Sequence, residues 1–460
     1  MLSPSEPARR VVLASTYDLG HQPLGLSSPA AWLRDAGATV RCLDLSLDRL
    51  DEGAVKDAAL IAFHVPMHTA TRLASEIIPK VRALNPAAHV AAYGLYASVN
   101  EEHLRSLGVS TVIGGEYEAA LVDVYEALTA GRDVVRNGTT IHLDKLQFRL
   151  PDRSGLPDVS EYGKLRALDG TDVVSGYTEA SRGCKHRCRH CPVVPVYDGT
   201  FRIVQRDIVL EDIAQQVAVG ARHVTFGDPD FFNGPAHGMA VVRSLHERFP
   251  DLTYDVTIKV EHLLRHRCFL AELAHTGCLF VTTAVEALDD NSLEILDKGH
   301  TRADFIEAVE LAQQAGLTLS PTFVTFAPWT TLEGYAALLE DIVAFDLVGH
   351  VSPVQLAIRL LIPRGSLLIG HPAMEEALGA FDPNRLSYQW CHVDPRVDAL
   401  QQDVQHAVED GDNTGESRQA TFARVWALAQ AASGANRPLP KFLPPVAVPH
   451  MSEPWYCCAE

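Results

Sequence analysis

The chain has 460 residues, 47% of them hydrophobic and 21% charged, a composition typical of a globular protein with a substantial core. Its net charge of −19, with no basic stripe, argues against nucleic acid as the primary partner. The sequence has no apolar run of about 18 residues or more, and no long apolar region follows the two arginines near its start, so we expect neither a membrane span nor a secretory signal.

Short apolar runs alternate with helical patterns over residues 8–132. The expected strands lie at 9–16, 39–45, 58–66 and 89–95, the expected helices lie at 27–38 and 70–86, and a strand, a glycine turn and a helix share 110–131. This alternation predicts a doubly wound parallel sheet of the Rossmann-like type. Residues 133–174 are polar with several prolines and glycines, which predicts a linker.

The alternation resumes with longer units over residues 175–370. The expected strands lie at 176–183, 223–231, 253–261, 279–287, 318–326 and 351–363, with helical patterns between them. Six strand–helix repeats predict a partial (β/α)6 barrel of the TIM type, so the chain as a whole is an α/β protein. In such barrels the chemistry lies at the C-terminal ends of the strands.

The C-terminal region, residues 371–460, differs from both. Residues 395–408 and 416–433 are expected to be helices, and the proline-rich stretch at 436–450 is expected to be an extended arm. The arm leads to the adjacent cysteines Cys457 and Cys458. With no leader expected, the nine cysteines argue against a disulfide framework and for metal binding or chemistry.

The strongest motif is "SRGCKHRCRHCPVVP", which follows the first expected barrel strand. It places Cys184, Cys188 and Cys191 in a C-x3-C-x2-C spacing. Three thiolates on one loop can hold three irons of a [4Fe–4S] cluster, which normally takes four cysteines, and leave one iron open. The alternative is a structural zinc site that uses these cysteines with His186 or His190.

This spacing, its place after the first strand and the repeats that follow resemble the radical S-adenosylmethionine (radical SAM) superfamily over residues 175–370. The resemblance implies that the three cysteines hold the cluster and that its open iron binds SAM. The reduced cluster then cleaves a sulfonium C–S bond and releases a carbon radical. An electron donor such as flavodoxin or ferredoxin and a reducing cytoplasm are implied as well. His190 matches a position near the adenine of SAM.

Further residues match positions near SAM in that superfamily. Gly227, Asp228 and Asp230, in "TFGDPDFFNG" after the second strand, are candidates to receive the SAM amino group. The alternative is a simple turn.

Three more candidates lie at the ends of later strands. Glu286, in "AVEALDDNSLEILDKGHT", matches an acid near the ribose or methionine of SAM. Lys259 is either a SAM contact or a solvated strand end. Arg359, on the sixth expected strand, is a candidate contact for the SAM carboxylate. Lys298 and Gly299 match a helix end with a structural role.

A doubly wound domain before such a barrel resembles the cobalamin-binding subclass of the superfamily. The subclass signature is D-x-H-x-x-G, and the nearest stretch here, "YDLGHQPLG", carries Asp18, His21 and Gly25 at a different spacing. Two interpretations stay open: a domain that binds cobalamin, or one that only shapes the active site or docks a partner.

The ending "WYCCAE" resembles the tail of the CUAEP/CCAEP-tail radical SAM proteins. Vicinal thiols are soft donors and can exchange with disulfides. Cys457 and Cys458 are therefore expected to be catalytic, either by holding a thiophilic acceptor such as trivalent arsenic or by acting as a redox pair.

Together these resemblances imply a transferase. It uses a [4Fe–4S] cluster to cleave SAM and installs a carbon group on a small-molecule acceptor, held by the tail pair if the acceptor is thiophilic. One alternative is a cobalamin-dependent radical SAM methyltransferase. The other is a non-catalytic iron–sulfur protein that senses redox state and docks a partner.

Overall fold

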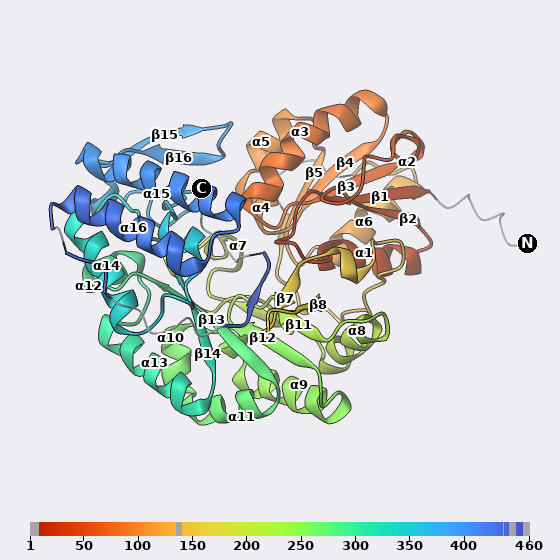
Figure 1. Ribbon diagram of the computed structural model, residues 1–460. Coiled ribbons are helices and arrows are strands. Elements are labelled where there is room, and N and C mark those ends of the chain that lie inside the picture. Colours follow the sequence, from red (N-terminus) through yellow and green to blue (C-terminus); the bar gives the residue numbers. More distant parts are fainter. Residues whose placement is uncertain (1–8, 135–139, 436, 441–447, 454–460) are drawn as a thin grey trace, which may run out of the picture.

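The structure is a computed structural model that describes residues 9–134, 140–435, 437–440 and 448–453. Two sheets with flanking helices lie next to each other, and a helical C-terminal region packs beside the second sheet (Figure 1). This arrangement confirms the predicted α/β fold class. Among the described residues, no helix is long and apolar enough to cross a membrane.

The first sheet is entirely parallel, in the strand order β2-β1-β3-β4-β5-β6. Residues alternate between its faces, so that Val11 and Leu13 pack under α1 and α6 while Val12 and Ala14 pack under the helices opposite. Its strands are β1 (Arg10–Ser15), β2 (Thr39–Asp44), β3 (Leu60–His64), β4 (His89–Tyr93), β5 (Thr111–Gly115) and β6 (Thr140–His142). Its helices are α1 (Leu24–Asp35), α2 (Glu52–Asp57), α3 (His68–Leu84), α4 (Leu95–Val99), α5 (Glu101–Ser106) and α6 (Glu118–Thr129).

The second sheet contains the five parallel strands of a partial barrel, in the order β14-β13-β12-β11-β8. Two antiparallel strands, β7 and then β17, extend it beyond β8. The bounds are β7 (Lys164–Arg166), β8 (Asp172–Thr178), β11 (His223–Phe226), β12 (Thr253–Thr257), β13 (Cys278–Glu286), β14 (Thr318–Phe323) and β17 (His450–Met451).

The sixth expected barrel strand is much reduced. Residues 353–356 form the 3-10 helix η4 (Pro353–Leu356), and the segment after it makes a single parallel bridge, between Phe326 and Arg359. Pro353 has no amide hydrogen to give a strand ladder, which is consistent with the turn that begins there. The barrel is therefore more open at this edge than six full repeats predict.

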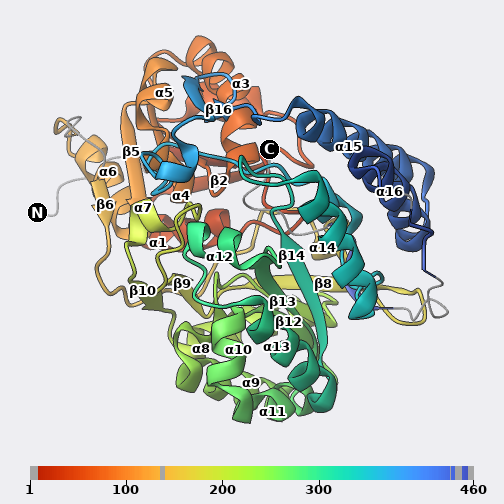
Figure 2. The same ribbon diagram turned by 90° about the vertical axis from the view of Figure 1, so that its left-hand side faces the viewer.

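Helices cover the outside of the barrel strands and enclose a core of aliphatic and aromatic side chains (Figures 1 and 2). These are α8 (Arg206–Ala218), α9 (Pro235–Arg248), α10 (Val260–Arg265), α11 (Leu270–His275), α12 (Asp290–Leu296), α13 (Arg302–Ala315) and α14 (Leu332–Ala344), with the 3-10 turns η2 (Phe231–Asn233) and η3 (Arg267–Phe269). The pair α15 (Pro395–Thr414) and α16 (Arg418–Ser433) packs beside α14.

Short elements complete the chain. The strands β9 (Ser181–Gly183) and β10 (Phe201–Ile203) pair with each other, and α7 (Val194–Tyr197) lies between them in the sequence. The strand β15 (Leu378–Asp382) pairs with β16 (Ser387–Trp390). Two further 3-10 turns are η1 (Val159–Glu161) and η5 (Pro372–Met374). Within the predicted linker, β6 joins the first sheet and β7 the second. The domain boundaries at 132, 174 and 370 stay predictions.

The carboxyl ends of the two sheets line the same space. Asp18 follows β1, Pro66 follows β3 and Leu95 follows β4, and all three line a cavity whose opposite side is formed by residues at the ends of β11 to β14. Open α/β sheets and barrels place their binding sites at these ends. The fold therefore directs two potential binding edges at one another.

Candidate functional site

The cysteine loop lies between β9 and α7, beside the end of the barrel. Its middle is anchored on α12, because the Arg189 amide donates to Leu296 O at 2.9 Å and its guanidinium donates to the carbonyls of Glu294 and Ile295. Cys188 is buried, and the two other predicted ligands, Cys184 and Cys191, are partly exposed. Burial raises the pKa of the Cys184 thiol to about 11.

Behind the loop lies a buried charged group formed by His190, Glu286 and Lys298. Glu286 Oε1 is 3.2 Å from Lys298 Nζ and 3.2 Å from His190 Nε2. Burial alone would raise the pKa of Glu286, but the Lys298 ammonium and His190 lower it to about 2. Burial lowers the pKa of Lys298, but Glu286 and the thiols of Cys188 and Cys191 outweigh it and raise that pKa. A buried cation thus faces two of the three cysteines. Sequence reasoning gave Lys298 only a helix-end role and missed this contact.

Gly227 and Asp228 follow β11 directly and line the cavity. A Cβ at Gly227 would lie 1.8 Å from Tyr177 Oη, so only glycine fits there. Asp228 accepts hydrogen bonds from the Ala180 amide at 2.8 Å and from Ser181 Oγ at 2.6 Å. Burial raises the pKa of Asp228 to about 7. Asp228 therefore holds the start of β9, from which the cysteine loop departs.

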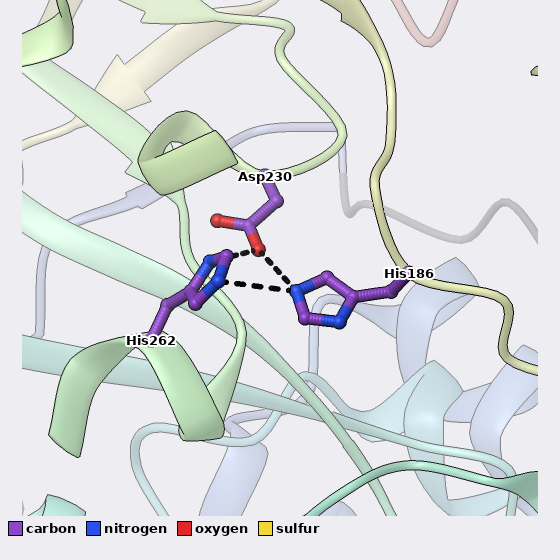
Figure 3. Close-up of side chains that lie close together, drawn as sticks. All are labelled: His186, Asp230 and His262. Atoms are coloured by element: carbon purple, nitrogen blue, oxygen red, sulfur yellow. Dashed lines mark hydrogen bonds and ion pairs between the residues drawn. The ribbon is translucent and has the colours of Figure 1, made fainter. Parts of the chain in front are cut away.

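Asp230, the third residue of that motif, is not among the residues that line this cavity. Its side chain lies with His186 and His262 (Figure 3). Burial would raise the pKa of Asp230, but the two imidazoles lower it to about 2. The structure thus separates Asp230 from Asp228, two of the three candidates to receive the SAM amino group.

Lys259 and Arg359 also make contacts away from the cavity. Lys259 is buried with its Nζ 3.6 Å from Glu261 Oε2. The Arg359 guanidinium stacks 3.5 Å from the centroid of the Trp390 ring and donates to Asp398 Oδ1 at 2.7 Å. Neither lines the cavity between the sheets, so the structure does not bring these two predicted SAM contacts together with Gly227 and Asp228.

The cavity itself has a volume of about 220 Å³. On the barrel side its lining includes Thr225, Asp255 and Thr282, and on the other side it includes His21, which stacks on Tyr177 with ring centroids 4.6 Å apart. Burial lowers the pKa of His21 to about 4. The uncharged imidazole and the hydroxyl groups give the cavity polar anchors in a largely enclosed setting.

The C-terminal segment contributes to the same cavity. His450, Met451 and Glu453 line it, and the Glu453 carboxylate accepts a hydrogen bond from Tyr17 Oη. Sequence reasoning missed these residues, because a two-residue strand carries no periodicity. Cys457 and Cys458, the predicted catalytic pair, lie outside the described residues.

A second cavity of about 190 Å³ adjoins the first, and Asp18, Leu95 and Gly227 line both. Gly25, Gly94 and His64 line its other end. His64 is buried, its Nδ1 has no hydrogen-bond partner among the residues that the structure describes, and burial lowers its pKa to about 3.

Residues 178–341 match the sequence model of the radical SAM superfamily. These residues form a radical SAM domain. It starts at the last residue of β8 and ends in α14, so it contains the cysteine loop and the strands β11 to β14. The predicted resemblance to this superfamily is confirmed, whereas the resemblance to the CUAEP/CCAEP tail stays a prediction.

The similarity to curated proteins and solved structures extends beyond that domain. The hopanoid C-3 methylase of Methylococcus capsulatus is 23% identical over 325 residues, which are 67% of this chain and 62% of the methylase. The chain thus spans less than two thirds of that relative.

Two solved structures share the fold over most of the chain. OxsB, a cobalamin-dependent radical enzyme with aqua-cobalamin and S-adenosylmethionine bound, has a TM-score of 0.69 and 14% identity, over 90% of this chain and 72% of OxsB. TsrM, a radical SAM methyltransferase from Kitasatospora setae with tryptophan and a SAM analogue bound, has a TM-score of 0.65 and 17% identity, over 93% of this chain and 96% of TsrM. At these identities the likeness shows the fold alone.

Proposed function

We propose that this chain is a radical SAM enzyme that transfers a carbon group from S-adenosylmethionine to a small-molecule acceptor. The observation that carries the proposal is the position of the three-cysteine loop. The loop lies inside the matched domain, and Asp228 links the start of the loop to the cavity at the ends of β11 to β14.

The residues of the loop fit a [4Fe–4S] cluster. Cys184, Cys188 and Cys191 offer three thiols without a fourth cysteine in the motif, and Lys298 offers a buried positive charge beside two of them. When bound, the cluster supplies the electron that splits SAM. A reductant such as flavodoxin or ferredoxin must first give this electron to the cluster.

Among the predicted SAM contacts, the geometry favours Gly227 and Asp228. Gly227 keeps the strand end open, and Asp228 offers a carboxylate at the cavity wall for the SAM ammonium group. We assign His190 and Glu286 to positioning the side of the cluster loop that faces Lys298. Lys259 and Arg359 are assigned structural roles, because each is engaged outside this cavity.

The two adjacent cysteines of the tail favour a thiophilic compound as the acceptor. Glu453 lines the cavity, and Cys457 follows it by four residues, which span at most about 14 Å. The number of intervening residues therefore limits Cys457 to about 14 Å from Glu453. Vicinal thiols bind soft elements such as trivalent arsenic.

The proposal is tested by SAM turnover in anaerobically reconstituted protein. With a strong reductant, the wild type should cleave SAM, and the released fragment identifies the transferred group. The C457S/C458S variant should keep its cluster and its SAM cleavage but lose transfer to a thiophilic acceptor. If a cluster-loaded wild type yields no SAM fragment, the chain is instead a non-catalytic iron–sulfur protein, and the proposal fails. Unchanged transfer by C457S/C458S removes the tail from the mechanism.

A second candidate function is cobalamin-dependent methyl transfer, which the likeness to OxsB and TsrM favours. Gly25, Gly94 and the unpartnered His64 Nδ1 suit a cofactor between the sheets. Retention of corrinoid after expression with hydroxocobalamin separates the two functions.

A further inference from the structure

A second group of potential metal ligands lies beside the cysteine loop. His186, Asp230 and His262 come from three different elements and point toward one another (Figure 3). His186 belongs to the cysteine loop, Asp230 follows β11, and His262 is on α10. One donor atom from each lies within 4.8 Å of the other two.

The group is buried and closely spaced. Asp230 and His262 are 1% and 0% exposed, and the His186 side chain is 13% exposed. Asp230 Oδ2 lies 2.6 Å from His262 Nδ1 and 3.6 Å from His186 Nε2, so one carboxylate oxygen is shared by both imidazoles. Donors gathered in this way can exchange these contacts for a common metal ion.

The spacing of the donors suits one metal ion. His186 Nε2 is 3.2 Å from His262 Nε2 and 3.6 Å from Asp230 Oδ2. Two donors that each lie about 2.1 Å from a tetrahedrally coordinated ion are roughly 3.4 Å apart, which falls between these two values. Two imidazoles and one carboxylate are ligands typical of divalent first-row ions such as zinc.

We propose that His186, Asp230 and one ring nitrogen of His262 bind a divalent transition-metal ion, separate from the ion or cluster held by the three cysteines. The surroundings support this assignment. Glu261 Oε2 lies 3.6 Å from His186 Nδ1, the ring nitrogen that faces away from Asp230, and Asp230 Oδ1 accepts the Phe232 amide at 3.0 Å. Carboxylates and amides placed in this way orient metal ligands.

The ion has a structural consequence for the cysteine loop. His186 lies between Cys184 and Cys188, so an ion held with Asp230 and His262 ties this loop to the end of β11 and to α10. The same half of the loop is held by Lys185, whose amide and ammonium group donate to Asn233 at 3.2 and 2.9 Å, and the other half is held by Arg189 on α12. The second site thus adds a further tie to the half of the loop that Arg189 does not reach.

Zinc binding to the cluster-loaded protein tests the proposal. Protein reconstituted anaerobically with iron and sulfide is dialysed against Zn²⁺, and both metals are counted by mass spectrometry. The wild type should hold one zinc per chain in addition to the cluster iron. Asp230→Asn and His262→Gln should each weaken zinc binding at least roughly 10-fold, because each removes a ligand. His275→Gln is the matched control: its ring lies 5.5 Å from that of His246, without a third close donor among the described residues.

A second arm separates this site from the cysteines. A variant with alanine at 184, 188 and 191 cannot hold a cluster or a thiolate-bound zinc, and it should still bind one zinc and gain thermal stability from it. This arm remains informative if no cluster loads, so failure of the proposed function does not obscure the result. Zinc that disappears with the cysteines, or equal zinc in the wild type and in both Asp230→Asn and His262→Gln, would show that the three side chains only share protons.

Discussion

At the scale of single residues, Lys298 explains how a carboxylate is kept ionised next to the cysteine loop. Glu286, Lys298 and His190 are all buried, and the lysine ammonium is 3.2 Å from Glu286 Oε1. Taking one charge out of water costs several kcal/mol unless a partner compensates it. The pair is therefore a unit: either charge alone would be destabilising, and together the two charges compensate one another.

We predict that Lys298→Met lowers the free energy of unfolding of the cluster-free protein by about 3–5 kcal/mol, because it leaves the Glu286 carboxylate buried without its cation. The double variant K298M/E286Q should recover much of this loss, since neither charge remains. Urea unfolding at neutral pH measures both.

Lys56→Met provides the control for that experiment, because Lys56 forms an exposed pair with Glu52 and should change stability by less than about 1 kcal/mol. Losses that simply add in K298M/E286Q would contradict the coupling.

At the scale of elements, the short strand β17 holds the segment at residues 450–453 in place. His450 and Met451 pair with Arg166 and Leu165 of β7, and the next residue continues the contact: the Ser452 amide donates to Lys164 O at 2.8 Å. The Lys164 amide donates in turn to Ser452 Oγ at 2.9 Å. These bonds hold the C-terminal segment against the cavity that Glu453 lines.

We predict that Ser452→Pro detaches this segment, because proline removes the amide hydrogen that Lys164 O accepts. Hydrogen exchange in β7 should become faster. SAM cleavage should persist, whereas transfer to the acceptor should fall roughly 10- to 100-fold through misplacement of the tail. Ser452→Ala keeps the amide hydrogen and should behave much more like the wild type. Unchanged exchange in β7 would show that the strand does not hold the segment.

Elements with strong periodicity could be predicted from the sequence, and elements set by long-range pairing could not. The strands β1 to β5 of the first sheet, the strands β8 and β11 to β14 of the second, and the cysteine loop follow from local patterns. The reduced sixth strand follows from Pro353 and from pairing that exists at one bridge only. The strand β17 depends on its pairing with β7, almost 300 residues earlier in the chain. The contacts of Asp230 depend on where α10 places His262. Neither feature therefore has a local sequence signal.

At the scale of the whole molecule, a buried ionic group joins the first sheet to the β9–β10 ribbon, from which the cysteine loop departs. Arg182, at β9, contacts Glu116 and Glu118 at the end of β5 and the start of α6, with distances of 3.3 and 2.8 Å. It also contacts Glu179 at 2.7 Å. One guanidinium cannot compensate three carboxylates, so at least one of them must resist ionisation. Burial raises the pKa of Glu116 to about 7, and it also raises the pKa of Glu179, so the carboxyl that resists ionisation is one of these two.

The sign of the resulting pH dependence follows from the direction of this shift. A carboxyl group with a raised pKa in the folded state binds its proton more tightly there than in the unfolded chain, so stability falls as pH rises between the two values. From about pH 4.5 to about pH 7, the wild type should lose up to roughly 3 kcal/mol of unfolding free energy relative to Glu116→Gln, whose amide does not titrate. Urea unfolding at a series of pH values measures the difference. Glu126→Gln, on the exposed face of α6, should show no such trend. A pH-independent difference between the wild type and Glu116→Gln would mean that another carboxyl group beside Arg182 binds the proton.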